Sequence, residues 1–206
     1  MSNRVFEIFL LHLLRCEGGC IPERGETMAV AFERCRQKAF TDDPRDPGGA
    51  TMMGITLKTF IVWRTQWMQK PKPTVADLRT LGFEEWRLIV EKLFWQRYSL
   101  QSVAWECLAL TAADSIFLSG AAGIRDIQQA LGCKPDGICG PRTIGALRHS
   151  CLTRDRARAA CYDIVRRRMA RLQQLSAWAR FGRGWEARAQ ALLEQLPRLD
   201  HAERDL

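Results

Sequence analysis

The sequence of 206 residues lacks any apolar segment long enough to span a membrane. Its main apolar run, residues 5–14, is interrupted by Glu7 and His12, whereas a spanning helix needs about 20 apolar residues. The run also lacks a small-residue cleavage site, so we expect no signal peptide. Alternating apolar and polar stretches are almost absent, apart from one small hairpin expected within residues 40–56. The chain is therefore predicted to be all-α, with that hairpin as its only β-structure.

The chain also lacks a Cys-x-x-Cys pair, although it contains eight cysteines. His12, Cys16 and Cys20 are four residues apart and would align as metal ligands on a continuous helix. Gly18 and Gly19 are expected to end that helix before Cys20. We therefore predict no metal and no cofactor.

Synthesis in the cytoplasm would leave the thiols reduced. Cys133 and Cys139 are close enough in the sequence to pair if the protein is exported. The sequence does not decide between these two states.

Neither a low-complexity segment nor a Ser/Gly linker divides the chain. Apolar residues make up 47% and charged residues 26% of the composition, and this length allows a sizeable core. We predict a single compact monomer with a soft division near residue 120. Residues 1–120 would form a catalytic lobe and residues 121–206 a helical lobe packed on it.

Acidic residues are too few to balance the basic ones, and the formal net charge is +8. Residues 154–188 contain ten arginines against three acids. Such a face suits polyanions such as cell-wall polymers, lipopolysaccharide or nucleic acid, although a solvated helix face is the simpler interpretation. No groove-reading element or stacking platform is evident, so no nucleic-acid partner is expected.

One acidic residue, Glu17, lies where a helix should bury its side chain. The preceding apolar residues follow helical spacing on one face, and they are Phe6, Phe9, Leu10, Leu13 and Leu14. Glu17 continues that face at the negative end of the helix dipole, which disfavours the charged carboxylate. A protonated carboxylic acid is what a general acid requires. The alternative is a glutamate that points into solvent at a helix end.

A second acid and a hydroxyl occur in the Gly- and Pro-rich segment 42–56. Breakers of this density predict an ordered turn region rather than a helix. Asp46 and Thr51 lie within it, and two carboxyl groups with a water-holding hydroxyl can hydrolyse a glycosidic bond. The alternative is a surface loop whose aspartates cap helices.

Three motifs therefore occur in order along the chain: Glu17-Gly18-Gly19, Asp46-Pro47-Gly48-Gly49-Ala50-Thr51 and Gly54-Ile55-Thr56. Together they resemble glycosyl hydrolase family 108. That family comprises muramidases of lysozyme-like helical fold, found as phage endolysins and as bacterial secretion-assisting lysozymes. Later segments fit the same family, namely the aromatic helix end 94–98, the peptidoglycan-binding motifs at 128–132, 136–137 and 140–143, and the closing motif 181–188.

The chain departs from the family pattern in three places. About twenty extra residues, 20–39, separate the first two motifs, and part of this insertion is predicted to be a short helix. Its function would be a flap, an interaction element or none, since loops tolerate insertions. Met52 and Leu118 each replace an asparagine that is usual in the family, which bears on specificity and rate.

The resemblance implies that the chain cleaves the bond between N-acetylmuramic acid and N-acetylglucosamine in peptidoglycan. Glu17 would protonate the glycosidic oxygen, Asp46 would stabilise the oxocarbenium-like centre or act as base, and Thr51 would hold the water. Substrate-binding roles are predicted for Thr56, Trp63, Trp95, Tyr98, Asp114 and Ser119. For the aromatic members, and for Trp67, a core position is the simpler interpretation, because tryptophan at helical spacing is more often a core residue.

Two other functions remain open at this stage. The departures could leave a silent peptidoglycan-binding or secretion-associated protein, and a lytic transglycosylase would make anhydro-sugar ends instead of reducing ends. A peptidoglycan substrate also implies that the chain leaves the cytoplasm. Without a signal peptide it would need a holin pore or a dedicated secretion route to reach the periplasm or cell wall.

Overall fold

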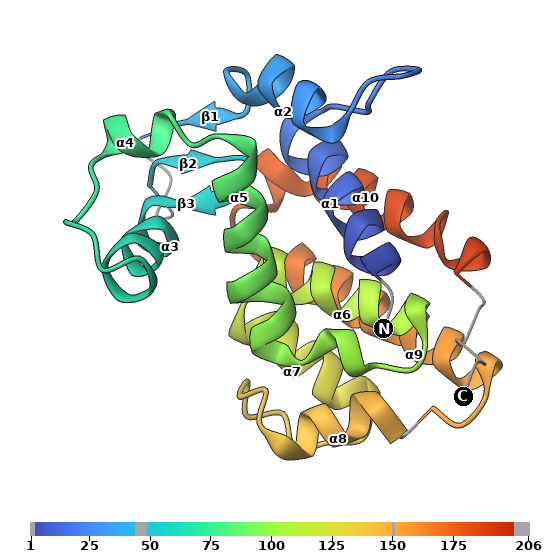
Figure 1. Ribbon diagram of the computed structural model, residues 1–206. Coiled ribbons are helices and arrows are strands. Elements are labelled where there is room, and N and C mark those ends of the chain that lie inside the picture. The colour runs from blue at the N-terminus through green and yellow to red at the C-terminus, as the bar shows by residue number, and fades with distance from the viewer. Residues whose placement is uncertain (1–2, 44–48, 150, 200–206) are drawn as a thin grey trace. The chain divides into compact units, whose positions relative to one another are not determined.

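The computed structural model describes residues 3–43, 49–149 and 151–199 (Figure 1). The described chain is mainly helical with one small sheet, which confirms the predicted all-α, lysozyme-like fold. It forms two compact units, described here separately. We call Leu10–Glu91 the hairpin unit, and Lys92–Leu206 with Met1–Phe9 the helical unit. The lobe boundary near residue 120 stays a prediction; within the helical unit, helix 106–119 packs on the helices that follow it.

The hairpin unit contains short helices around the sheet (Figure 1). Helix α1 (Asn3–Gly18) begins in the helical unit and ends in the hairpin unit, and the π-helical turn η2 (Val90–Trp95) also spans the boundary. The other elements of the hairpin unit are α2 (Met28–Arg36), β1 (Phe40–Thr41), β2 (Thr51–Met52), β3 (Ile55–Thr56), α3 (Leu57–Val62), η1 (Trp63–Trp67), α4 (Val75–Arg79) and α5 (Phe83–Ile89).

The sheet is antiparallel, in the order β1-β2-β3. Thr51 on the central strand lies opposite Thr41 on one side and Thr56 on the other. A two-residue turn, Met53-Gly54, joins β2 to β3 with φ values of 47° and 77°. Two positive φ values in succession are typical of the type I′ turn that suits a tight hairpin. The hairpin predicted within residues 40–56 is therefore confirmed, with β1 as a third strand.

Local sequence signals account for several helix starts in this unit. Thr27, Thr56 and Thr74 each precede a helix and accept a backbone hydrogen bond from the first turn. The Asp77 carboxylate accepts a hydrogen bond from the Thr74 amide at 2.7 Å, which completes a capping box. The insertion does contain a short helix, α2.

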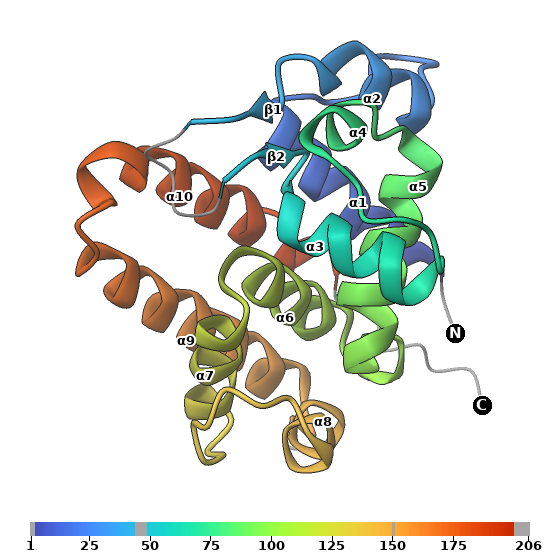
Figure 2. The same cartoon turned by 90° about the vertical axis from the view of Figure 1, so that its left-hand side faces the viewer.

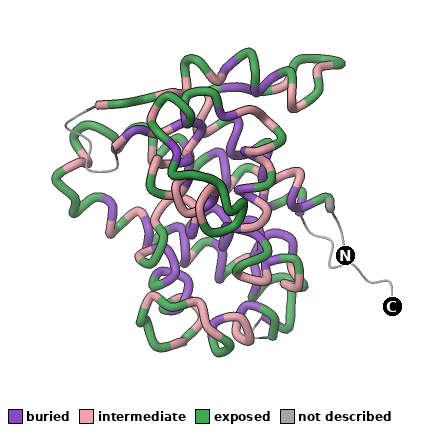
Figure 3. The backbone as a smooth tube through the Cα atoms, turned by 60° about the vertical axis from the view of Figure 1, so that its left-hand side comes forward, coloured by how far each residue is buried: buried purple, intermediate pink, exposed green. Residues whose placement is uncertain are grey.

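The helical unit is built from longer helices. Its elements are η3 (Gln96–Tyr98), η4 (Leu100–Ser102), α6 (Glu106–Ser119), α7 (Ala121–Ala130), α8 (Pro141–His149), α9 (Arg154–Gln173), α10 (Trp178–Leu193) and η5 (Leu196–Arg198). Helix α6 packs on α7 and α9, as Figures 1 and 2 agree. Every residue from Glu106 to Ile116 is buried, which makes α6 the central core helix of this unit. Buried segments recur along the chain in Figure 3.

The packing of α7 on α6 depends on the absence of one side chain. A Cβ atom at Gly123 would lie 2.0 Å from the carbonyl oxygen of Ser115, which belongs to the backbone of α6. A helix backbone cannot move aside as a flexible side chain can. The two helices therefore approach each other through a glycine.

We expect Gly123→Ala to lower the free energy of unfolding by at least about 1–3 kcal/mol, the usual cost of overpacking. Gly145→Ala is the matched control, because a Cβ at Gly145 in α8 would meet open space. That change should be neutral or stabilising by up to about 1 kcal/mol, from helix propensity. Urea unfolding followed by circular dichroism measures both, and equal stabilities would contradict the packing described.

Candidate active site

Glu17 lies half-buried in the last turn of α1, as the apolar stripe before it indicated. Gly19 follows with φ of 63°, a left-handed conformation that glycine adopts without steric cost. The amide of Cys20 then donates a hydrogen bond to the carbonyl of Leu14 at 3.1 Å. The helix end that carries Glu17 is therefore fixed by its backbone.

Gly18 brings this helix end against the hairpin turn. A Cβ atom at Gly18 would lie 2.9 Å from both the Sδ and the Cε atom of Met53. The Met53 side chain is fully buried, and its carbonyl accepts a 3.0 Å hydrogen bond from the indole of Trp86. Because this turn residue has a positive φ, which is costly for a side-chain-bearing residue, the two contacts hold it in place.

Thr51 lies on the central strand of the same sheet, two residues before Met53, and is half-buried. Its hydroxyl donates a hydrogen bond to the carbonyl of Gly49 at 3.2 Å. A hydroxyl has one proton and two lone pairs, so Thr51 can still accept a hydrogen bond from a water molecule. Asp46, the second predicted acid, lies outside the described residues.

Met52, which replaces the asparagine usual at this position, is buried with 1% exposure. It pairs with Phe40 on β1 and Ile55 on β3. An apolar thioether there supplies packing in place of the polar groups of an amide. Leu118, at the other departure, is half-buried in the last turn of α6.

Two predicted substrate-binding residues, Thr56 and Trp63, belong to the hairpin unit and have structural partners. The Thr56 hydroxyl caps α3 by accepting from the Thr59 amide at 3.2 Å. The Trp63 ring is buried, and its indole donates to Glu85 at 2.9 Å. Trp67 stacks on Trp63 with ring centroids 6.1 Å apart and is 49% exposed. Of these two rings, Trp67 is therefore the one with exposed surface that a sugar could contact.

The other predicted substrate-binding residues lie in the helical unit. Trp95 is 5% exposed and packs against Phe6 and Phe9, which favours the core interpretation for its ring. Tyr98 is half-buried, and desolvation raises the pKa of its phenol. Ser119 is half-buried at the end of α6.

Asp114 is fully buried in α6, and its carboxylate lies between two arginines. Arg168 donates to one oxygen, and Arg188 donates to the other at 2.7 Å. Burying a carboxylate is costly unless it is paired with cations and hydrogen-bonded. These contacts give Asp114 a structural role that joins α6, α9 and α10, and no part of its side chain is exposed to a glycan.

Gln128 organises the segment that resembles a peptidoglycan-binding motif. Its buried side-chain amide donates to Asp136, Ile138 and Thr143, and its carbonyl accepts from the Gly137 amide. The Ile138 amide and the Gln128 amide lower the pKa of Asp136. The connection between α7 and α8 is therefore ordered around one glutamine.

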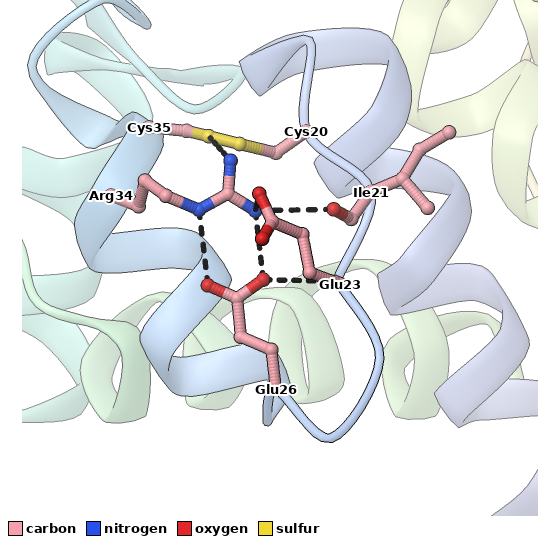
Figure 4. The surroundings of a disulfide bond; sticks show 6 residues. All are labelled: Cys20, Ile21, Glu23, Glu26, Arg34 and Cys35. Atoms are coloured by element: carbon pink, nitrogen blue, oxygen red, sulfur yellow. Dashed lines mark hydrogen bonds and ion pairs between the residues drawn. A yellow bond between two sulfur atoms is a disulfide. The ribbon is translucent and has the colours of Figure 1, made fainter.

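Sequence reasoning missed the disulfide between Cys20 and Cys35, whose Cα atoms are 6.2 Å apart (Figure 4). The sequence left the redox state of the thiols open; this pair is bonded, while Cys133 and Cys139 are free. Cys20 therefore bonds Cys35 and does not join His12 and Cys16 as a metal ligand. The only sequence signal was the position of both cysteines inside the insertion 20–39.

A family model described as Glycosyl hydrolase 108 matches residues 37–120. The match confirms, over that part of the chain, the resemblance drawn from the sequence motifs. It includes the hairpin with Thr51 and begins after Glu17, within the last residues of the insertion.

The solved structure of SagA from Brucella abortus is similar in fold, with a TM-score of 0.70 and 24% sequence identity. That likeness covers 99% of this chain and 98% of the SagA chain. A comparison with curated proteins finds no match.

We expect Trp86→Phe to lower the free energy of unfolding by about 1–3 kcal/mol, because it removes the buried indole donor from the Met53 carbonyl. Trp67→Phe is the control, since that exposed ring has no such role and should change stability by less than about 0.5 kcal/mol. Chemical denaturation of the two variants checks the prediction. An unchanged stability for Trp86→Phe would show that the hydrogen bond does not support the turn.

Proposed function

We propose that this chain, which matches glycosyl hydrolase family 108 over residues 37–120, is an N-acetylmuramidase that uses Glu17 as its general acid. The observation that carries the proposal is the contact between Gly18 and Met53. It connects the helix end that bears Glu17 directly to the hairpin that bears Thr51. A carboxylic acid and a hydroxyl on two connected, well-ordered elements suit hydrolysis of a glycosidic bond.

In this mechanism Glu17 donates its proton to the oxygen between N-acetylmuramic acid and N-acetylglucosamine. The leaving sugar departs as an alcohol, and positive charge develops at the anomeric carbon.

The second half of the reaction requires water at the anomeric carbon. A water that donates a hydrogen bond to Thr51 would keep its lone pairs available for attack. Asp46 is proposed, from the sequence alone, to stabilise the oxocarbenium-like centre or to accept the proton of that water. The separation between its carboxyl group and that of Glu17 would decide between retaining and inverting chemistry.

A second function, binding to peptidoglycan without turnover, is favoured by one observation. Met52 is buried and apolar beside Thr51, where the family usually has an amide. A site without that amide would orient the glycan through fewer hydrogen bonds at the reacting bond, which would lower the rate of cleavage. The export route, by a holin pore or a secretion machinery, is part of the proposal in either case.

Digestion of purified sacculi by wild type and Glu17→Gln tests the function. We expect wild type to release reducing muropeptides and Glu17→Gln to be slower by about 10²–10⁴-fold, the usual contribution of a general acid. The exposed acid Glu84 supplies the control, and Glu84→Gln should digest at the wild-type rate. Mass spectrometry identifies the fragments.

Normal digestion by Glu17→Gln would exclude Glu17 as the acid. Anhydro-sugar products from wild type would show a lytic transglycosylase. Binding to sacculi with no product from wild type would establish the silent binding protein.

A further inference from the structure

The Cys20–Cys35 disulfide lies beside the proposed acid. Cys20 is three residues after Glu17, and its own amide closes the end of α1. Cys35 lies in the last turn of α2, where its Cβ atom is 3.7 Å from the Cβ position of Gly18. Both cysteines are buried, at 2% and 6% exposure. The bond therefore joins the two ends of the insertion against the residue that follows Glu17.

The loop that this bond closes is ordered further by one arginine, as Figure 4 shows. Arg34 donates to both oxygens of Glu26, at 3.0 and 2.7 Å, and to the carbonyl of Ile21 at 3.2 Å. The hydrogen bond from Arg34 lowers the pKa of Glu26 to about 2. The Arg34 side chain is 42% exposed, although that of Glu26 is only 11% exposed. An ion pair with an exposed partner contributes little, so the covalent disulfide is the stronger link across the loop.

Helix α2 has a separate attachment to the hairpin unit. The Phe32 ring is fully buried, with its centroid 5.3 Å from that of Trp86 and 5.8 Å from that of Phe83. Loss of the disulfide would therefore leave α2 docked through Phe32. It would release the covalent link between α2 and the segment that follows Gly19, so the effect should concentrate at the end of α1.

We propose that the Cys20–Cys35 disulfide positions Glu17, so that the site works in the oxidised form and is held back while both thiols are reduced. This proposal rests on the muramidase function proposed above. Cys20 and Cys35 are positioning residues in it, because they act through Gly18 and the end of α1 and do not contact the glycan.

Formation of the bond is an ordinary thiol–disulfide exchange. The two thiols lose two protons and two electrons and form one S–S bond, and the electrons reduce a small-molecule or protein disulfide to two thiols. Thiols stay reduced in most cytosols, and disulfides persist in oxidising compartments such as the periplasm. The chain would thus remain weakly active where it is made and become active where its substrate lies.

The test compares the oxidised protein with protein reduced by dithiothreitol, both kept below the unfolding temperature of the reduced form. The rate is measured on soluble glycan chains, so that kcat and KM are obtained separately. We expect reduction to lower kcat by about 10- to 100-fold, as misplacement of a catalytic group by about 1 Å can do, with KM nearly unchanged. Oxidised glutathione should restore the rate.

Hydrogen exchange supplies a second readout that does not need activity. Amides at Glu17–Cys20 should exchange faster after reduction, while those of α5 keep their protection. Cys20→Ser and Cys35→Ser should both reproduce the reduced state and no longer respond to dithiothreitol. Cys133→Ser, at a free cysteine, should keep the full response.

Equal kcat and equal exchange in the two redox states would overturn the proposal. A loss of protection throughout the hairpin unit would also overturn it, because the bond would then support the fold in general. Faster exchange confined to residues 17–20, in a protein that releases no glycan in either state, would uphold the positioning role and reject the muramidase function.

Discussion

The contact between Gly18 and Met53 is the constraint on which the proposed site depends. The thioether of Met53 occupies the space that a side chain at residue 18 would fill. That arrangement requires a glycine at the end of α1 and a methionine in a turn where glycine or asparagine is usual. The helix end and the hairpin therefore fix each other, and Glu17 and Thr51 lie on the two elements so joined.

Other interactions in the hairpin unit support this contact by different chemistry. Trp86 donates to the carbonyl of Met53, which holds the turn despite its positive φ. The same indole packs on Phe32 of the insertion, and the insertion returns to Gly18 through Cys35. The insertion thus helps to support the helix end. An insertion without any function, which the sequence also allowed, describes it less well.

Periodicity and local chemistry were sufficient for much of the fold. The apolar stripe of α1, the capping box at Thr74 and the nearly continuous apolar character of α6 depend on neighbouring residues, which a sequence displays directly. The hairpin was predictable for the same reason, since its breakers are local. The order of the motifs indicated a resemblance to one family, and the match of that family's model over residues 37–120 agrees with it for that part of the chain.

The features that the sequence did not reveal involve side chains whose partners are distant in the sequence. Cys20 forms a disulfide with Cys35, fifteen residues later in the sequence. No spacing rule distinguishes that pair from the other possible cysteine pairs. Asp114 is an acid that could bind a ligand, as the sequence suggested. Its buried carboxylate instead pairs with two arginines that lie 54 and 74 residues away in the sequence. Trp63 and Trp67 share one helical segment, and only the tertiary partner Glu85 determines which ring is covered.

A double-mutant cycle between Gly18 and Met53, measured on the free energy of unfolding, tests the central constraint most directly. Gly18→Ala should be destabilising in wild type because its Cβ meets the thioether, and much less so in Met53→Ala, where that space is empty. We predict that the double variant is more stable than the sum of the single changes by about 1 kcal/mol or more. Additivity within about 0.3–0.5 kcal/mol would show that the contact does not connect the helix end to the hairpin.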